Sequence, residues 1–458
     1  MFRLCWLLSL LILLLAPTAE AQDTVHVSLS EAISRAVRIS PDIDIQRARV
    51  RFAEARRDQA VRSRFLTDLK ATSAHAVAPG LNNPNDTPTD RLYLDPDVRN
   101  DWGNLAPFSR VDVDLIQPLW TWGQLGRTID AAEAGIGVET GGVEVKELEV
   151  ALRTARLYYS VVLLSAMDSL TDEAEEAVGR AKREVERLLN EGSPDVGDAD
   201  LFQVQITEQE LRRRTIEVRE ESQTAHSGLR RQLMLPDHTV VTAEDRFLEP
   251  LILALDSLDI YQGLALQNRP EFAQAAAGIV ARTALVDVAR SDYYPKLVWG
   301  VHAHYSGTVD RFRQRNPYVG DSFLSRSLET GLGMRLELNF SQTRAKVEQA
   351  RANLQEVRYQ ETAAQQLILL EVEQAYRRVR IRQASLAAAE ESFRIARVWL
   401  QTEYVNFDLD LGDTDDLIKA VQAKLQLQAS RHEAVFQLNM AILELHAATG
   451  LLEPLLAH

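Results

Sequence analysis

The mature part of this chain lacks cysteine, and that absence narrows its chemistry. The only cysteine, Cys5, lies in a segment, residues 1–21, that is typical of a secretory signal peptide. It has a positive start, an apolar stretch over Leu4–Leu15 and the small-residue cleavage pattern Ala19–Ala21. We therefore expect a mature chain that starts near Gln22, without disulfides, cysteine-ligated metals or cysteine nucleophiles.

Long apolar runs and an excess of basic charge are also missing. After the leader, no stretch reaches the roughly 18 uncharged apolar residues of a membrane-spanning helix, and the best candidate, Leu157–Met167, is about half that length. If the mature chain crosses a membrane, we expect it to do so as strands. The formal charge of −15 argues against a nucleic-acid partner, because phosphate binding calls for basic patches.

Sequence signatures of enzymes are absent as well. There is no nucleophile elbow, phosphate loop or zincin spacing, and Gly331 and Gly333 lie in a strand-like stretch without a following phosphate-loop helix. We expect neither an enzyme nor a cofactor.

What the chain does contain is an internal duplication. The segments Ser28–Ala32 and Ser40–Asp42 are echoed, 229 residues later, by Ser257–Asp259 and Arg269–Glu271. A period this long indicates a duplicated half-molecule rather than a solenoid. After the signal peptide we predict a first structural repeat over residues 22–250 and a second over residues 251–458.

Both repeats contain long helical stretches. Apolar residues recur at steps of three and four, for example over Val145–Ala155 and Val435–Leu445, as in coiled coils. From Gln342 to Glu403 there is neither proline nor glycine, which predicts a helix on the order of 90 Å long. Such a helix must lie against other long helices, so we predict a mainly α fold of antiparallel coiled-coil helices that form a helical barrel.

Four shorter stretches change to an alternating pattern. Leu328–Phe340 is apolar at every second position, and Leu297–Tyr305 alternates in the same way. Leu69–Val77 and Val111–Leu115 occupy the corresponding places in the first repeat. This is the pattern of membrane strands with an apolar outer and a polar inner face. We predict one strand pair at about residues 67–117 and another at about 296–340.

Turn-rich polar segments separate the strands of each pair. Residues Ala78–Arg110 and Ser306–Ser327 are dense in Asn, Asp, Pro and Gly, and we expect both to be surface loops. A sheet in lipid must close, because an open edge leaves backbone groups unpaired. Four strands are too few to close, since the smallest membrane barrels have about eight. Several chains must therefore share one barrel, unless the four strands belong to a soluble sheet.

The order of these features resembles the TolC-like outer membrane efflux family over essentially the whole mature chain. The residues that carry the resemblance are the openings Leu29–Ala32 with Ser40–Asp42 and Leu258–Ala265 with Asn268–Glu271, and the strand-to-helix step Gln117–Gly123. The second repeat has Leu338–Gln342 in place of that step.

The resemblance implies a homotrimer with four strands per chain in a twelve-stranded outer-membrane barrel and a helical tunnel in the periplasm. It also implies docking to a periplasmic adaptor, a membrane fusion protein, and to an inner-membrane pump. Family members serve drug and metal efflux or protein secretion.

The resemblance also directs attention to two helix-turn-helix tips, Val196–Leu201 and Leu411–Leu417. A trimer would bring their aspartates together around a narrow opening, where like charges attract cations or basic residues of a docking partner. The candidate tip, gate or adaptor-contact residues are Gly197, Asp198, Asp200, Gly412, Asp413 and Asp415. The alternative is helix capping, because an aspartate at the start of a helix accepts hydrogen bonds from free N–H groups.

Two possible metal sites are disfavoured by the sequence. The aspartates of Asp408–Asp416 lack the glycine and glutamate spacing of an EF-hand loop. His302 and His304 face the same side of one strand but have no third ligand nearby in sequence, so polar lining of a lumen is the favoured interpretation.

Together these features predict an outer-membrane channel subunit of a tripartite efflux or type I secretion system, a passive exit duct from the periplasm to the exterior. The alternative is a wholly periplasmic coiled-coil scaffold or adaptor, which would need no membrane strands. Adaptors carry compact glycine-rich β domains between their helical hairpins, and no such region is found in the sequence.

Overall fold

The structure, a computed structural model, describes residues 24–65, 68–83, 99–192, 196–245, 247–311, 320–408 and 414–451. The predicted signal peptide lies outside the described residues. The chain forms two compact units, each built from both halves of the sequence. Unit 1 comprises Met1–Arg47, Gly141–Phe272 and Thr362–His458, and unit 2 comprises Ala48–Thr140 and Ala273–Glu361.

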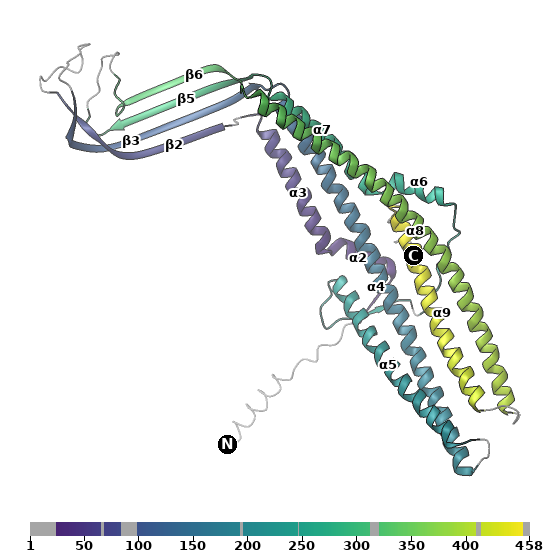
Figure 1. Cartoon of the computed structure of the whole chain (residues 1–458). Helices are drawn as coiled ribbons and strands as arrows, with labels where there is room; N and C mark the ends of the chain where they lie inside the picture. The colour runs from purple at the N-terminus through teal and green to yellow at the C-terminus, as the bar shows by residue number, and fades with distance from the viewer. Residues whose placement is uncertain are drawn as a thin grey trace, which may run out of the picture. The chain divides into compact units, whose positions relative to one another are not determined.

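The same series of elements occurs twice along the chain (Figure 1). Each series has two short helices, two strands and two long helices. The first is α2 (Leu29–Ile39), α3 (Pro41–Arg62), β2 (Asp68–Asn82), β3 (Arg99–Trp120), α4 (Gln124–Glu191) and α5 (Asp198–Gln232). The second is α6 (Leu258–Asn268), α7 (Pro270–Ser291), β5 (Lys296–Thr308), β6 (Ser325–Arg335), α8 (Phe340–Asp408) and α9 (Thr414–Ala448).

Local sequence explains how each series opens. Ser28 caps α2, with its Oγ accepting from the N–H of Glu31 while the Glu31 carboxylate accepts from the N–H of Ser28. Pro41 and Pro270 are the first residues of α3 and α7, where a missing N–H costs nothing. The residue before each proline is extended and ends the preceding helix.

The core of unit 1 lies between its long helices. Fully buried side chains from α2, α4, α5 and α9 meet there, among them Ile33, Tyr158, Leu229 and Leu443. Ion pairs at the surface link neighbouring helices, for example Lys182 of α4 with Glu208 of α5 at 2.8 Å. Long helices thus pack against one another within a single chain, as the sequence predicted.

Unit 1 also contains a small sheet that the sequence analysis did not expect. Strand β1 (Thr24–Val27) pairs in parallel with β4 (Val240–Ala243). Each strand has four residues and its partner lies more than two hundred positions away, so no local alternation reveals either one.

Unit 2 contains the four long strands, which lie side by side in the order β2-β3-β5-β6 (Figure 1). All neighbours are antiparallel. The β3–β5 pairing joins the two hairpins. Within the described ranges the sheet of the single chain is open, with β2 and β6 at its edges.

The boundaries predicted for the two loops between the strands were wrong. The segment Ala78–Arg110 is not all loop, because β2 continues to Asn82 and β3 already begins at Arg99. Likewise β5 extends into the predicted loop Ser306–Ser327 as far as Thr308, and β6 begins at Ser325. Cross-strand pairing holds these polar ends in the sheet despite their turn-forming residues.

The predicted strand over Leu328–Phe340 ends early. Strand β6 stops at Arg335, which pairs with Lys296, the first residue of β5. Beyond that point no partner strand continues, since Pro295 precedes β5 and has no N–H to donate. The carbonyl of Asn339 instead accepts from the N–H groups of Gln342 and Thr343, and α8 begins.

In the first series the strand-to-helix step is a tight turn. Trp122 and Gly123 both have positive φ, 54° and 85°, and α4 begins directly after them. The indole N–H of Trp122 donates to the Pro295 carbonyl at 2.8 Å, which holds the turn against the start of β5.

Among the described residues, one helix, α7, is long and apolar enough to cross a membrane by length and composition alone. Only 11% of its most apolar window is buried in the chain. Much of its apolar character comes from alanine, and Gln274 bonds to the Val138 carbonyl of α4 at 3.0 Å. Small side chains of this kind suit close helix packing.

Candidate functional site

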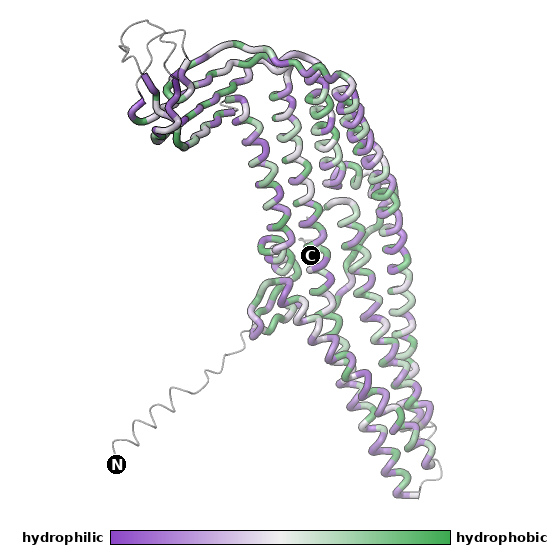
Figure 2. The backbone as a smooth tube through the Cα atoms, turned by 60° about the vertical axis from the view of Figure 1, so that its left-hand side comes forward, coloured by the Kyte–Doolittle hydropathy of each residue, from purple (hydrophilic) through white to green (hydrophobic). Residues whose placement is uncertain are grey.

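The sheet of unit 2 has two chemically different faces. Figure 2 shows hydrophilic and hydrophobic positions alternating along its strands. The register places Trp299, Val301 and Ala303 of β5 on one face, next to Leu328 and Leu332 of β6. These β6 side chains are 74% and 71% exposed in the single chain. One face of the sheet is therefore apolar and uncovered.

The opposite face carries a row of polar side chains. The residues of this polar face are Lys70 of β2, Arg110, Asp112 and Asp114 of β3, His302 and His304 of β5, and Ser325, Ser327 and Glu329 of β6. The two faces thus have the apolar and polar character that the alternating sequence predicts.

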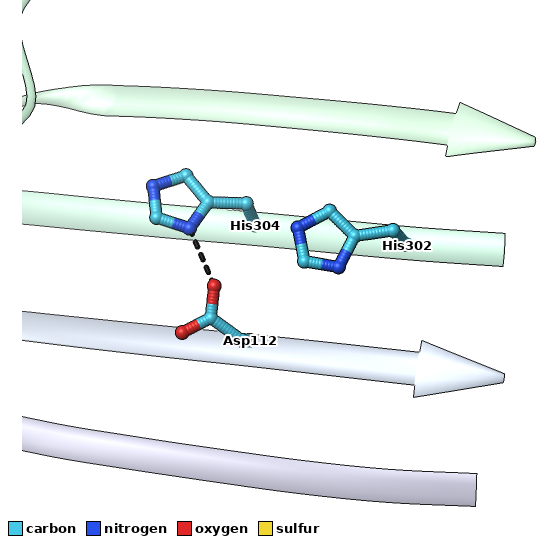
Figure 3. Close-up of side chains that lie close together, drawn as sticks. All are labelled: Asp112, His302 and His304. Carbon is cyan, nitrogen blue, oxygen red and sulfur yellow. Dashed lines mark hydrogen bonds and ion pairs between the residues drawn. The ribbon is translucent and has the colours of Figure 1, made fainter. Parts of the chain in front are cut away.

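Two histidine–aspartate pairs cross from β5 to β3 on the polar face. The Nδ1 of His304 lies 2.7 Å from Oδ1 of Asp112 (Figure 3). The Nδ1 of His302 lies 2.7 Å from Oδ1 of Asp114. The two imidazole rings are stacked, with centroids 6.4 Å apart and planes 16° apart. Sequence reasoning identified the histidines but missed the aspartates.

Further hydrogen bonds fix the ends of this cluster. Arg110 donates to both carboxylate oxygens of Asp112, at 2.7 and 3.2 Å. The Nε2 of His304 lies 3.0 Å from Oγ of Ser325. Beside His302 the sheet is hollowed where Gly300 faces Gly331, in a cavity of about 450 Å³ that Asp114 and Glu329 also line.

The loop end of the sheet is held by a buried arginine that the sequence analysis did not single out. Arg311 is ion-paired to Asp321 at 2.7 Å. Its guanidinium also donates to the carbonyls of Pro79 and Gly80 and to Asn100. One side chain thus ties the ends of β2 and β3 to the segment after β5. Nothing in the local sequence marks this role, because its partners come from three separate segments.

The second candidate region is the pair of helix starts in unit 1. Gly197 is the N-cap of α5, in an extended conformation. Its N–H donates to the Asp200 carboxylate at 2.8 Å, while Asp198 is exposed in the first turn. Asp200 therefore caps the helix, as the alternative interpretation of these acids expects.

Asp415 lies in the first turn of α9 and connects two helices. Its Oδ1 accepts from Nε2 of Gln203 of α5 at 3.0 Å, and it forms an ion pair with Lys419. The hydrogen bond from Lys419 lowers the pKa of the Asp415 carboxyl below its usual value. The other two candidates, Gly412 and Asp413, lie outside the described residues.

A small apolar cluster supports these helix starts. Val185 of α4 and Val204 of α5 are buried together with Val196, and Ile418 of α9 packs against them. The structure thus brings Asp200 and Asp415 to neighbouring helix starts over one shared apolar cluster. Asp198, by contrast, is exposed to solvent.

The chain matches one family model in sequence and several solved outer-membrane channels in fold. Residues 262–404 match the family model of outer membrane efflux proteins. The outer-membrane channel OprN matches with a TM-score of 0.72 at 18% identity, covering 92% of this chain and 89% of that one. The CmeC outer-membrane channel of Campylobacter jejuni matches with a TM-score of 0.70 at 15% identity, covering 95% and 90%. Among curated proteins, no sequence matches this chain.

The open state of the MtrE outer-membrane channel of Neisseria gonorrhoeae matches as well, with a TM-score of 0.70 at 12% identity, covering 92% of this chain and 89% of that one. This chain has the fold of the TolC-like outer-membrane channels. The family resemblance predicted from the sequence is therefore confirmed, by sequence over residues 262–404 and by fold over nearly the whole chain.

The family model describes outer membrane efflux proteins, and the matched structures are outer-membrane channels. Both findings bear on the two functions that the sequence left open. The channel interpretation is therefore supported over the scaffold or adaptor alternative. It also gives the two faces of the sheet a meaning, since a channel wall needs one face for lipid and one for water.

Proposed function

We propose that this chain is one subunit of a homotrimeric outer-membrane channel, a passive exit duct of a tripartite efflux or type I secretion system. The observation that carries the proposal is the open four-stranded sheet, with an apolar face on one side and a polar face on the other. Its four strands span the outer membrane, and its helices extend into the periplasm.

The open edges supply the argument for three chains. Among the residues that the structure describes, strands β2 and β6 each present one edge without a partner strand. In lipid, each unpaired backbone group costs several kcal/mol, so the edge of β6 must meet the β2 edge of a neighbouring subunit. With four strands per chain, three chains form a barrel of the size that the TolC-like fold implies.

The helices also leave surfaces for a neighbour. On α8, Leu367, Ile381 and Ile395 recur two heptads apart and are 67%, 60% and 55% exposed. Two-heptad spacing places the three side chains on one stripe of the helix. An apolar stripe of this length is suited to packing against a helix of the adjacent subunit.

The tips of the helical hairpins are the proposed contact with the adaptor. In this proposal Gly197 and Gly412 would make the turns. Asp198, Asp200, Asp413 and Asp415 would surround the narrow end of the tunnel in the trimer. Their negative charge attracts basic residues of a periplasmic adaptor or closes the opening through links to basic side chains. The inner-membrane pump supplies the energy, and this chain carries out no chemical reaction.

We further propose that the two series of elements are structural repeats, residues 22–250 and 251–458, that arose by duplication. The matched lengths support this origin, with 11 residues in both α2 and α6 and 35 in both α5 and α9. Each repeat supplies one hairpin to the barrel.

The mature protein, extracted in detergent, tests the channel proposal. Native mass spectrometry should find three chains per particle, and reconstitution into planar bilayers should give stable single-channel conductance. A stable monomer without bilayer-embedded β structure would refute it.

The tip proposal needs a separate test. Replacement of Asp198, Asp200, Asp413 and Asp415 together by Asn should change the gating of the reconstituted channel and reduce export in cells. Glu176 and Glu220, exposed acids on α4 and α5, provide a control pair when changed to Gln. Unchanged conductance and unchanged export in the quadruple variant would leave capping as the sole role of these acids.

A further inference from the structure

We propose that Asp112, His302 and His304 form a binding site for a divalent transition-metal ion on the polar face of the sheet. One ligand atom from each residue can be chosen so that all three lie within 4.8 Å of one another (Figure 3). Two imidazoles and one carboxylate are a donor set that suits Zn²⁺ and its neighbours Ni²⁺, Co²⁺ and Cu²⁺. The class of ligand follows from these donors alone.

Strand geometry brings the three residues together. His302 and His304 are two positions apart on β5, so both side chains stand on the same face. The antiparallel register places Asp112 of β3 directly opposite His304. The site is therefore built on two adjacent, paired strands rather than on loops, which limits how far its ligands can drift apart.

In each imidazole ring, one nitrogen is hydrogen-bonded to a residue that is not a proposed ligand, and the other nitrogen is placed to bind a metal. The Nδ1 of His302 is hydrogen-bonded to Asp114, and the Nε2 of His304 is hydrogen-bonded to Ser325. Figure 3 shows the other His302 nitrogen turned toward His304 and the Nδ1 of His304 turned toward Asp112. Partners of this kind fix the ring orientation and the tautomer of metal-binding histidines.

The ligand atoms need only a small movement. Around a tetrahedral Zn²⁺ with bonds near 2.1 Å, neighbouring ligand atoms lie about 3.4 Å apart. The three groups must close by up to about 1.4 Å from their present separations. Rotation of the His302 side chain can supply this movement, because that side chain is 40% exposed and borders the hollow next to Gly300.

Arg110 competes with the metal for Asp112, since it donates to both of its oxygens. Acids nearby offset this positive charge. Asp114 contacts His302, and Glu329 is its register partner on β6. A bound divalent ion would replace the hydrogen bond between His304 and Asp112, while Arg110 can keep the carboxylate oxygen that does not bind the metal.

This inference goes beyond the proposed duct, which needs no metal to pass its cargo. Only one consequence rests on the proposed function: in a trimer the site would occur three times around the shared lumen. Metal binding itself requires just the pairing of β3 with β5 within one chain, so it can be tested without measuring transport.

Isothermal titration of the metal-free mature protein in detergent with ZnCl₂ tests the site. We expect saturable binding of one Zn²⁺ per chain. His302→Gln, His304→Gln and Asp112→Asn should each weaken it at least tenfold, and the double variant H302Q/H304Q should abolish it. The matched control is His75→Gln, since His75 stands on the other face of the same sheet and pairs with Ser109. The Zn²⁺ affinity of the His75→Gln variant should equal that of the wild type.

A second measurement needs no variant and so does not depend on variant folding. Diethyl pyrocarbonate modification, mapped by mass spectrometry, should be suppressed by Zn²⁺ at His302 and His304 but not at His75. Equal modification of all three histidines with and without Zn²⁺, or Zn²⁺ binding that persists in H302Q/H304Q, would overturn the proposal. If the reconstituted protein binds Zn²⁺ but shows no channel conductance, only the proposed channel function is rejected, and the metal site stands.

Discussion

The two units of this chain differ in how far they bury their apolar side chains. In unit 1, Leu443, Leu229 and Tyr158 are fully buried within the single chain. In unit 2, the sheet leaves Leu328, Leu332 and Met334 of β6 more than 70% exposed. Unit 1 therefore contains its own hydrophobic core, whereas the apolar face of the sheet is uncovered in the single chain. In the proposed channel, lipid and neighbouring subunits would cover that face.

This difference predicts which mutations lower the stability of the single chain and which act only on membrane insertion. A change in the core of unit 1 should lower the stability of each chain, whatever its assembly state. A change on the apolar face of the sheet should leave the isolated chain unaffected and act only when the strands enter a membrane. The following substitutions test this division.

The largest effect is expected in the core of unit 1. Leu443→Ala removes a fully buried side chain from α9 and should lower the free energy of unfolding by about 2–5 kcal/mol. Thermal unfolding followed by circular dichroism measures this. Leu367→Ala on α8 is the control, since its side chain is 67% exposed and should matter for trimer assembly only. Equal losses of unfolding free energy in both variants would contradict a core enclosed within one chain.

The next effect concerns the two faces of the sheet. Leu332→Arg places a charge on the apolar face and should cost about 2–4 kcal/mol if that position is near the middle of the bilayer. Ser327→Arg, on the polar face of the same strand, should cost little. The yield of folded trimer after insertion into lipid vesicles measures both. If the two variants insert equally well, the assignment of the apolar face to lipid is wrong.

A smaller effect should appear at the turn between the strand and the helix. Gly123 has φ of 85°, so Gly123→Ala should destabilise the turn by about 1–2 kcal/mol. Gly126→Ala should have the opposite sign, a gain of about 0.5–1 kcal/mol, because Gly126 lies in the first turn of α4 with open space around it. The two midpoints of thermal unfolding should therefore lie on either side of that of the wild type.

Sequence patterns predicted the long elements well because their signals are local. The stretch without proline or glycine after Gln342 predicted α8, and the alternation over Leu297–Tyr305 predicted the faces of β5. Strand ends were mispredicted because they depend on a partner: β6 ends at Arg335 where β5 begins.

The candidate site shows the same limit. His302 and His304 are visible in one strand, but Asp112 reaches them only through the register between β3 and β5. The alternation of Arg110, Asp112 and Asp114 was a usable signal, since it predicts that the three side chains share one face. Arg311 gave no such signal, because its partners lie on three segments far apart in sequence.

The smallest expected effect is a change in how the stability of unit 1 depends on pH. His432 of α9 in unit 1 is partly buried, and its Nδ1 has no hydrogen-bond partner among the described residues. Burial lowers the pKa of His432 below the usual value, and the positive charge of Arg431 adds to this shift. Since the unfolded chain takes up a proton near pH 6.5 and the folded chain only at lower pH, stability is retained above about pH 6.5 and lost as pH falls toward the folded pKa. His432→Gln should remove this part of the acid sensitivity from the unfolding midpoint of the helices. Its slope between pH 7 and 5 should flatten relative to the wild type, whereas His238→Gln, at an exposed turn, should leave the slope unchanged. An identical slope in all three proteins would show that burial of His432 does not couple unit 1 to pH.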